Sequence, residues 1–332
     1  MAHGQPTTAY MFWRSSWEQS APFSLSPLSS TPRFQPSRQA TNLPRSENDD
    51  YVLDHAFEAD FAADTHRTFE PEELISYVYP GTDRRSGPWQ YVNTQYVLAG
   101  MIASKASGMS YADALKEKIF EPLQLHQTYY RPRVPPKRVL DLMPSAYFNQ
   151  SYCKAFAQVE PPCPQFPLDS LLGQDLKAVN LSIYDATGGI VASLSDVSRW
   201  VRAMFSDTLL PPRQKEELFS LVSEVSGQPV AAISKDDPTG FSMGIVQGWA
   251  PFLKSPILWT YTGQSYGFTV QWFRRPGDDL VFVIGVNSVA NAPSKVDIPP
   301  LYETVFRIFE PQSVADPNAA PPPSLSEHDV AP

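Results

Sequence analysis

Tyr91 and Asn93 are the residues of this 332-residue chain best suited to chemistry, and they lie two positions apart in the run Trp89-Gln90-Tyr91-Val92-Asn93. A phenol can pass a proton to a leaving group, and a carboxamide can hydrogen-bond a substrate carbonyl. A phenol with a pKa near ~10 does this at neutral pH only when a nearby cation lowers its pKa. A triplet this short also occurs by chance, with the tyrosine packed on a helix N-terminus and the asparagine as its cap, so its surroundings decide.

A serine nucleophile is the partner that such a pair requires. A Ser-x-x-Lys motif would supply the serine together with a lysine one helical turn away. The sequence holds one match, Ser151-Tyr152-Cys153-Lys154, which follows Tyr91 in a proline-rich stretch without helical periodicity, and we interpret it as a chance match. No lysine precedes Tyr91, since the first one in the chain is Lys105.

A second serine motif, Gly263-Gln264-Ser265-Tyr266-Gly267, matches the Gly-x-Ser-x-Gly elbow of α/β-hydrolases. That elbow needs a strand before the serine and a helix after it. Residues 268–273 alternate like a strand, and the required acid and histidine would be Asp278 or Asp279 with His328, which lies in a proline-rich tail. We therefore expect a β-turn between two strands, and an α/β-hydrolase using Ser265 remains a third hypothesis.

The elements around these motifs follow from the apolar pattern. Residues 94–107 carry one apolar stripe and are followed by Gly108, which predicts a helix that starts beside the Tyr-x-Asn triplet. A second helix is expected after Ser110 and a third after a cap at Ser195. Towards the C-terminus, residues 257–262, 267–274 and 280–287 have the texture of strands, with a tight turn at 276–279, and residues 300–309 form a closing helix. Middle helices followed by an antiparallel meander indicate an α+β arrangement.

Several stretches occur in the order typical of one family. The chain resembles the serine β-lactamase and penicillin-binding-protein superfamily, within it the class C-like esterases, carboxypeptidases and transesterases. The resemblance covers residues 38–310 and rests on Leu43-Pro44-Arg45, Tyr91-Val92-Asn93, Gly108-Met109-Ser110, Glu121-Pro122-Leu123 with Thr128, the block 186–193 with Asp196, Trp200 and Val201, and Tyr261-Thr262-Gly263 where the family carries Lys-Thr-Gly or His-x-Gly. It implies a β-lactamase/transpeptidase-like α+β fold, with a helical region, a C-terminal antiparallel sheet and a closing helix.

The same resemblance implies roles for individual residues. Tyr91 would relay the proton in acyl-enzyme chemistry, and Asn93 would hydrogen-bond the substrate carbonyl. Tyr261, Thr262 and Gly263 would line the strand edge against which the substrate lies, and a backbone N–H at Gln264 or Ser265 would be a candidate oxyanion donor. Ser265 itself is counted among the substrate-binding residues.

Two departures from the family pattern limit these roles. Tyr261 replaces the cation of the strand motif, so activity on charged β-lactams is not expected. Relatives that act on esters tolerate such a replacement better. The missing Ser-x-x-Lys indicates either a fragment of an ancestral enzyme or a gene model that lost an N-terminal piece, and we expect the helix after Asn93 to lack a packing partner. The leading hypothesis is a serine hydrolase or acyltransferase relative acting on a small-molecule ester, thioester or amide, in secondary metabolism. The alternative is a catalytically inactive binding or scaffold protein.

Composition restricts the partners. A net charge of −9 without a Lys/Arg cluster argues against nucleic acid or an anionic membrane surface, so the expected partner is a small molecule. No signal peptide or apolar run of membrane-spanning length is seen, which predicts a cytoplasmic protein. No cofactor or metal is expected: the histidines have no ligand spacing, and Cys153 and Cys163 are interpreted as free thiols. By composition we expect an irregular Ser/Pro-rich segment at 1–45, one domain at 46–310 and a disordered Pro-rich tail at 311–332.

Overall fold

The computed structural model describes residues 10–12, 50–79, 91–130, 135–149, 151–253, 256–277, 279–287 and 298–309, with the backbone path alone given for 10–12, 155–156 and 298–303. The helices are η1 (Tyr51–Leu53), α1 (His55–Ala63), α2 (Pro71–Ser76), α3 (Asn93–Ser107), α4 (Tyr111–Leu115), η2 (Lys116–Phe120), α5 (Lys137–Leu140), η3 (Cys153–Ala157), η4 (Pro167–Leu171), η5 (Leu181–Ile183), α6 (Asp185–Gly188), α7 (Leu194–Phe205), α8 (Pro212–Leu218) and α9 (Ile298–Phe309). The strands are β1 (Tyr10–Phe12), β2 (Thr128–Tyr130), β3 (Ile190–Ser193), β4 (Leu221–Ser223), β5 (Pro229–Val230), β6 (Thr239–Phe241), β7 (Val246–Trp249), β8 (Ile257–Gln264), β9 (Thr269–Arg274) and β10 (Val281–Val286).

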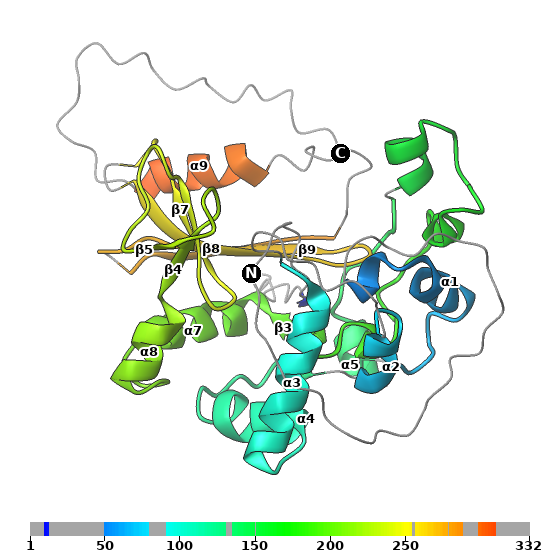
Figure 1. The fold of residues 1–332 in the computed structure, drawn as a ribbon, viewed down its shortest axis with the longest axis horizontal. Coiled ribbons are helices and arrows are strands. Elements are labelled where there is room, and N and C mark those ends of the chain that lie inside the picture. The colour runs from blue at the N-terminus through cyan, green and yellow to red at the C-terminus, as the bar shows by residue number, and fades with distance from the viewer. Residues whose placement is uncertain are drawn as a thin grey trace, which may run out of the picture.

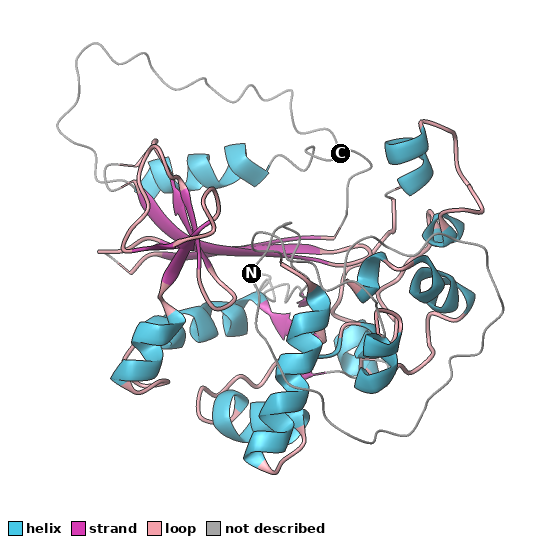
Figure 2. Ribbon diagram, viewed as in Figure 1, coloured by secondary structure: helices cyan, strands magenta, loops and turns pink. Residues whose placement is uncertain are grey.

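The strands form two antiparallel sheets. The larger sheet has seven strands in the order β10-β9-β8-β7-β6-β4-β5, and the smaller has three in the order β1-β3-β2. Helices α1 to α5 lie to one side of the large sheet, while α9 and the pair α7 and α8 cover its two faces (Figures 1 and 2). The α+β arrangement expected from the sequence is therefore observed, with most helices before the meander of the large sheet and the closing helix α9 after it.

Alternation along β9 explains how the large sheet is covered on both faces. Successive side chains of a strand point to opposite faces. Trp272 is fully buried and packs edge-on against Trp200 of α7, whereas the adjacent Phe273 packs edge-on against Phe306 of α9. Between β9 and β10 the chain turns at Pro276 and Gly277, as expected, and Gly277 adopts a φ of 102° that favours glycine.

The helix beside the Tyr-x-Asn triplet forms as predicted. It ends at Gly108, which caps it with a left-handed φ of 69° and donates its N–H to the carbonyl of Ser104. The expectation that this helix would lack a packing partner is wrong, because Val97 is fully buried and α3 packs against η1, α2, α4 and α6.

Gly100 sets how closely α3 approaches α6. A Cβ placed on Gly100 would lie 2.5 Å from the Cβ of Ala186, a distance that real atoms do not tolerate. The absence of a side chain at this position therefore lets α6 lie directly on the middle of α3, about two turns from Asn93.

Two local expectations are corrected. The cap of α7 is Ser193 rather than Ser195: Ser193 ends β3 with an extended backbone and its Oγ accepts the N–H of Asp196 at 3.2 Å, while Ser195 is exposed. The two cysteines were expected to be free thiols, yet Cys153 and Cys163 form a disulfide with a Cα–Cα separation of 5.8 Å. Beside the bridge, the carboxylate of Asp169 accepts the backbone N–H groups of Tyr152 and Cys153 and holds this side of the loop.

Gly100→Val should destabilise the fold by about 2 kcal/mol, because overpacking a filled interface displaces one of its two elements. Ala99→Val, at the adjacent exposed position of the same helix, is the matched control and should change stability by about 0.5 kcal/mol. Urea unfolding followed by circular dichroism measures both, and equal losses for the two variants would contradict the close α3–α6 contact.

Under non-reducing conditions neither cysteine should react with iodoacetamide in the unfolded protein, and both should react after dithiothreitol treatment. Intact mass distinguishes the two states by two added carbamidomethyl groups. Labelling of both cysteines without reductant would show that the thiols are free after all.

Candidate active site

The carboxylate of Asp50 organises the N-terminus of α3. Val92, the residue before this helix, offers no side-chain acceptor to the first-turn N–H groups. Instead Asp50, 5% exposed, accepts the backbone N–H of Asn93 at 3.1 Å and its Nδ2 at 2.7 Å through the same oxygen. The next residue, Tyr51, donates its N–H to Thr94 Oγ1 at 3.1 Å. A negative charge here also complements the helix dipole.

The other end of the Asn93 amide faces two hydroxyl groups. Its Oδ1 accepts Thr187 Oγ1 at 2.7 Å and the Tyr91 hydroxyl at 3.4 Å. Because Asp50 takes Nδ2 and these hydroxyls take Oδ1, the amide has a single orientation that satisfies all of them. Asn93 is 3% exposed, so its Oδ1 holds the Tyr91 and Thr187 hydroxyls from a buried position.

An aromatic wall closes the opposite side of Tyr91. Its ring lies 5.1 Å from that of Tyr96 and 6.2 Å from that of Phe241 on β6. Phe241 in turn packs edge-on against Tyr261 of β8, at 6.3 Å. The structure therefore brings Tyr91, Asn93 and Tyr261 to one place, where the start of α3 faces the middle of the large sheet.

Burial raises the pKa of the Tyr91 hydroxyl well above its usual value of about 10. The nearby Tyr96 raises it further, and hydrogen bonds with Thr187 and Tyr261 oppose the shift only in part. Burial likewise raises the pKa of Tyr96. None of the groups acting on Tyr91 is a cation, so in this arrangement the phenol is a hydrogen-bond donor at neutral pH and is not poised as a base.

The remaining predicted site residues follow β8 away from Tyr91. Thr262 and Gly263 pair with Gln271 and Val270 of β9. Ser265 lies four residues beyond Tyr261, about 14 Å along an extended strand. Its N–H donates to the carbonyl of Phe268 at 2.8 Å, so that the turn itself uses this candidate oxyanion donor.

The turn at Ser265 joins β8 to β9, as expected, and no helix follows it. The strand–turn–helix context of a nucleophile elbow is therefore not met. Of its expected partners, Asp279 binds Arg202 and Arg274, whereas Asp278 and His328 lie outside the described residues. The α/β-hydrolase hypothesis is not retained.

The Ser151…Lys154 match has a structural role. Ser151 is buried, donates its Oγ to Asp169 at 3.0 Å and accepts the N–H of Lys154. The ammonium of Lys154 lies 3.2 Å from Glu160, at the surface. The pair is not arranged for proton transfer between serine and lysine, which agrees with its interpretation as a chance match.

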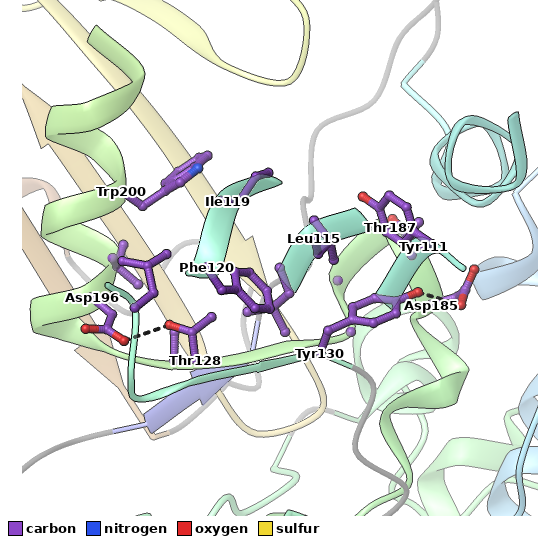
Figure 3. Close-up of a pocket in the computed structure, with 17 residues that line it drawn as sticks. Tyr111, Leu115, Ile119, Phe120, Thr128, Tyr130, Asp185, Thr187, Asp196 and Trp200 are labelled. Carbon is purple, nitrogen blue, oxygen red and sulfur yellow. Dashed lines mark hydrogen bonds between the residues drawn. The ribbon is translucent and has the colours of Figure 1, made fainter. Parts of the chain in front are cut away.

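A cavity of about 250 Å³ has Thr187, the hydrogen-bond partner of Asn93, among its lining residues (Figure 3). It lies between α4 and η2 on one side and β2, β3, α6 and α7 on the other, and its middle is apolar. The lining residues include Leu115, Ile119, Phe120, Leu125, Ile190, Ala192, Val197 and Trp200. Thr187 thus belongs both to the cavity wall and to the hydrogen-bond group around Asn93.

A model of the family described as Beta-lactamase matches residues 52–304. The chain belongs to the beta-lactamase family. It is 30% identical over 147 residues to penicillin-binding protein 4* of Bacillus subtilis (strain 168), which covers 43% of this chain and 29% of that protein, so the chain spans less than a third of this relative.

Solved structures share the fold. The D-stereospecific amidohydrolase from Streptomyces sp. superposes with a TM-score of 0.59 at 22% identity, covering 77% of this chain and 68% of its own. The D-amino acid amidase from Ochrobactrum anthropi SV3, complexed with L-phenylalanine, gives 0.56 at 20% identity over 73% and 66%. The superfamily suspected from the sequence is confirmed by the family match over residues 52–304. Within the described residues no helix is long and apolar enough to span a membrane.

Sequence reasoning missed three members of the cluster. Asp50 precedes its partner Asn93 by 43 positions, and nothing in the sequence joins them. Thr187 was noted only inside the 186–193 block, although a hydroxyl residue beside a Gly-Gly pair was a usable signal. Tyr96 was counted as part of a helix, and its spacing of five from Tyr91 gave no indication of a shared aromatic cluster.

Tyr91→Phe should flatten the loss of stability at alkaline pH. A phenol with a raised folded-state pKa stays neutral in the fold, whereas the unfolded chain ionises near pH ~10, so the stabilisation is complete below about pH 10 and is lost as pH rises further. Urea unfolding between pH 9 and 11.5 should show a slope shallower by up to about 1.4 kcal/mol per pH unit in the variant. Tyr79→Phe, which removes a hydroxyl at a 58% exposed position, is the control. Equal slopes for the wild type and Tyr91→Phe would contradict the buried phenol.

Proposed function

We propose that the protein acts on an ester, thioester or amide of a small molecule through the acyl-enzyme chemistry of its family. The observation that carries this proposal is the fixed group of Tyr91, Asn93 and Thr187, which faces β8 and adjoins an apolar cavity. Membership of the beta-lactamase family and the likeness to structures named as an amidohydrolase and an amidase support it. The proposal includes a substrate from secondary metabolism, as the sequence resemblance implies.

In this proposal the substrate carbonyl lies between β8 and the start of α3. The Tyr91 hydroxyl, whose contact with Asn93 Oδ1 is long at 3.4 Å, turns to donate its proton towards the leaving group, while Thr187 keeps its hydrogen bond to Asn93. Asn93 keeps both hydroxyls aligned, so its contribution is preorganisation, which is the effect that makes polar groups in an enclosed site effective. The serine nucleophile of this chemistry is not assigned to a residue of the sequence.

A second candidate is a protein that binds such a molecule without turning it over. The raised pKa of Tyr91 favours it, because a desolvated phenol without a neighbouring cation does not accept a proton at neutral pH. The two candidates share the same residues and differ in whether a covalent adduct forms.

The deciding experiment combines hydrolysis of p-nitrophenyl butyrate with labelling by a fluorophosphonate probe and mass mapping of the adduct. For the enzyme we expect hydrolysis above background, one labelled serine, and a kcat lowered by about 100-fold in Tyr91→Phe, since a positioned proton-transfer group contributes about that much. Tyr79→Phe should retain full activity.

Binding of the ester without turnover and without labelling would select the second candidate. If the protein neither binds nor hydrolyses the ester, both candidates are contradicted. Hydrolysis that survives Tyr91→Phe unchanged would show that the reaction occurs elsewhere on the protein.

A further inference from the structure

We propose that the cavity next to Thr187 is a specificity pocket for a medium-length aliphatic acyl chain. This inference rests on the proposed function, because it names the substrate class of the same site. A ligand would place its carbonyl at the Tyr91 and Asn93 cluster and extend its alkyl chain into the cavity towards Trp200.

The cavity is elongated and apolar in its middle. In Figure 3 the labelled side chains run from Trp200, Asp196 and Thr128 at one end, past Ile119, Phe120 and Leu115, to Tyr130, Asp185 and Thr187 at the other. Most of the side chains in its middle are aliphatic. A cavity lined mainly by apolar side chains suits a flexible alkyl chain, whose binding is favoured mainly by its transfer out of water.

The polar groups at the two ends of the cavity are hydrogen-bonded to other residues of its wall. At the far end Thr128 Oγ1 donates to Asp196 Oδ2 at 2.9 Å, and the same oxygen accepts the N–H of Gln127 at 2.8 Å. At the near end the Tyr130 hydroxyl donates to Asp185 Oδ1 at 2.8 Å. An alkyl chain can therefore fill the space between them without breaking either hydrogen bond, so no buried polar group loses a partner.

Thr187 connects the pocket to the proposed chemistry. Its Oγ1 lies 2.7 Å from Asn93 Oδ1, and the same residue lines the cavity. The reacting carbonyl and the alkyl chain of one ligand can thus be held by adjacent groups, which is how a specificity pocket acts on a reaction.

Direct binding tests the pocket without requiring turnover. Isothermal titration of the full chain should compare N-methyloctanamide with N-methylacetamide, which has the same amide and six fewer methylene groups. Because each buried methylene tightens binding by about fourfold, we expect the longer amide to bind at least about 100-fold more tightly.

Ile119→Trp, at a half-buried position on the cavity wall, should weaken binding of N-methyloctanamide by at least about 10-fold, because the larger ring occupies the pocket. Ile102→Trp on α3, where the isoleucine is 54% exposed and outside the cavity, is the matched control and should bind like the wild type. Thermal melts verify that both variants are folded.

The results separate this proposal from the proposed function. Suppose that binding depends on chain length, that Ile119→Trp removes it, and that no ester is hydrolysed. This result would support the acyl-chain pocket and contradict the proposed enzyme activity. Equal affinities for the two amides would contradict the acyl-chain pocket, and so would N-methyloctanamide binding that Ile119→Trp leaves unchanged. If short esters are still hydrolysed, the proposed enzyme activity stands without the pocket.

Discussion

The contact between the Asp50 carboxylate and Asn93 is the interaction on which the rest of the site depends. It joins a residue before α1 to the first turn of α3 and replaces the cap that Val92 cannot provide. A buried hydrogen bond to a charged group contributes about 1.5–3 kcal/mol, and removing the carboxylate would leave three donors, from Asn93 and Val52, without their acceptor. The orientation of the Asn93 amide, and through it the positions of Tyr91 and Thr187, follows from this one carboxylate.

The electrostatic character of the site follows from its walls. Aromatic rings from α3, β6 and β8 surround Tyr91 and exclude water, so its phenol is held neutral. The fold of the beta-lactamase family is thus present together with a Tyr91 phenol that is neutral and acts as a hydrogen-bond donor. A cation placed beside Tyr91 would be required to reverse this, since burial alone always disfavours the phenolate.

Local sequence patterns predicted the elements well, and long-range pairings escaped them. The helix from Asn93 to Gly108 and the β8–β9–β10 meander could be predicted because apolar period, capping glycine and turn residues all act within a few positions. The position of α7 was misjudged because Ser193 and Ser195 are equally good caps in isolation, and only the pairing of β3 decides between them.

The disulfide and the role of Asp50 could not be predicted, since both depend on distances that the fold creates. Nine residues separate Cys153 from Cys163, and only the fold of the loop between them brings their Cα atoms to 5.8 Å. In the same way, the cavity is made by side chains from two stretches of the chain, residues 111–130 and 185–200, which the fold brings together.

Strand β2 fixes the length of the cavity. Thr128 and Tyr130 are two residues apart, so both side chains leave the same face of the strand, with bases about 7 Å apart along it. Thr128 hydrogen-bonds Asp196 and Tyr130 hydrogen-bonds Asp185, so the spacing along β2 sets the distance between the two acidic ends of the cavity. A shift of one residue in the pairing of β2 with β3 would turn both hydroxyls to the opposite face at once. The dimensions of the cavity therefore depend on the register of a three-residue strand, and a change in that register would alter them in one discrete step.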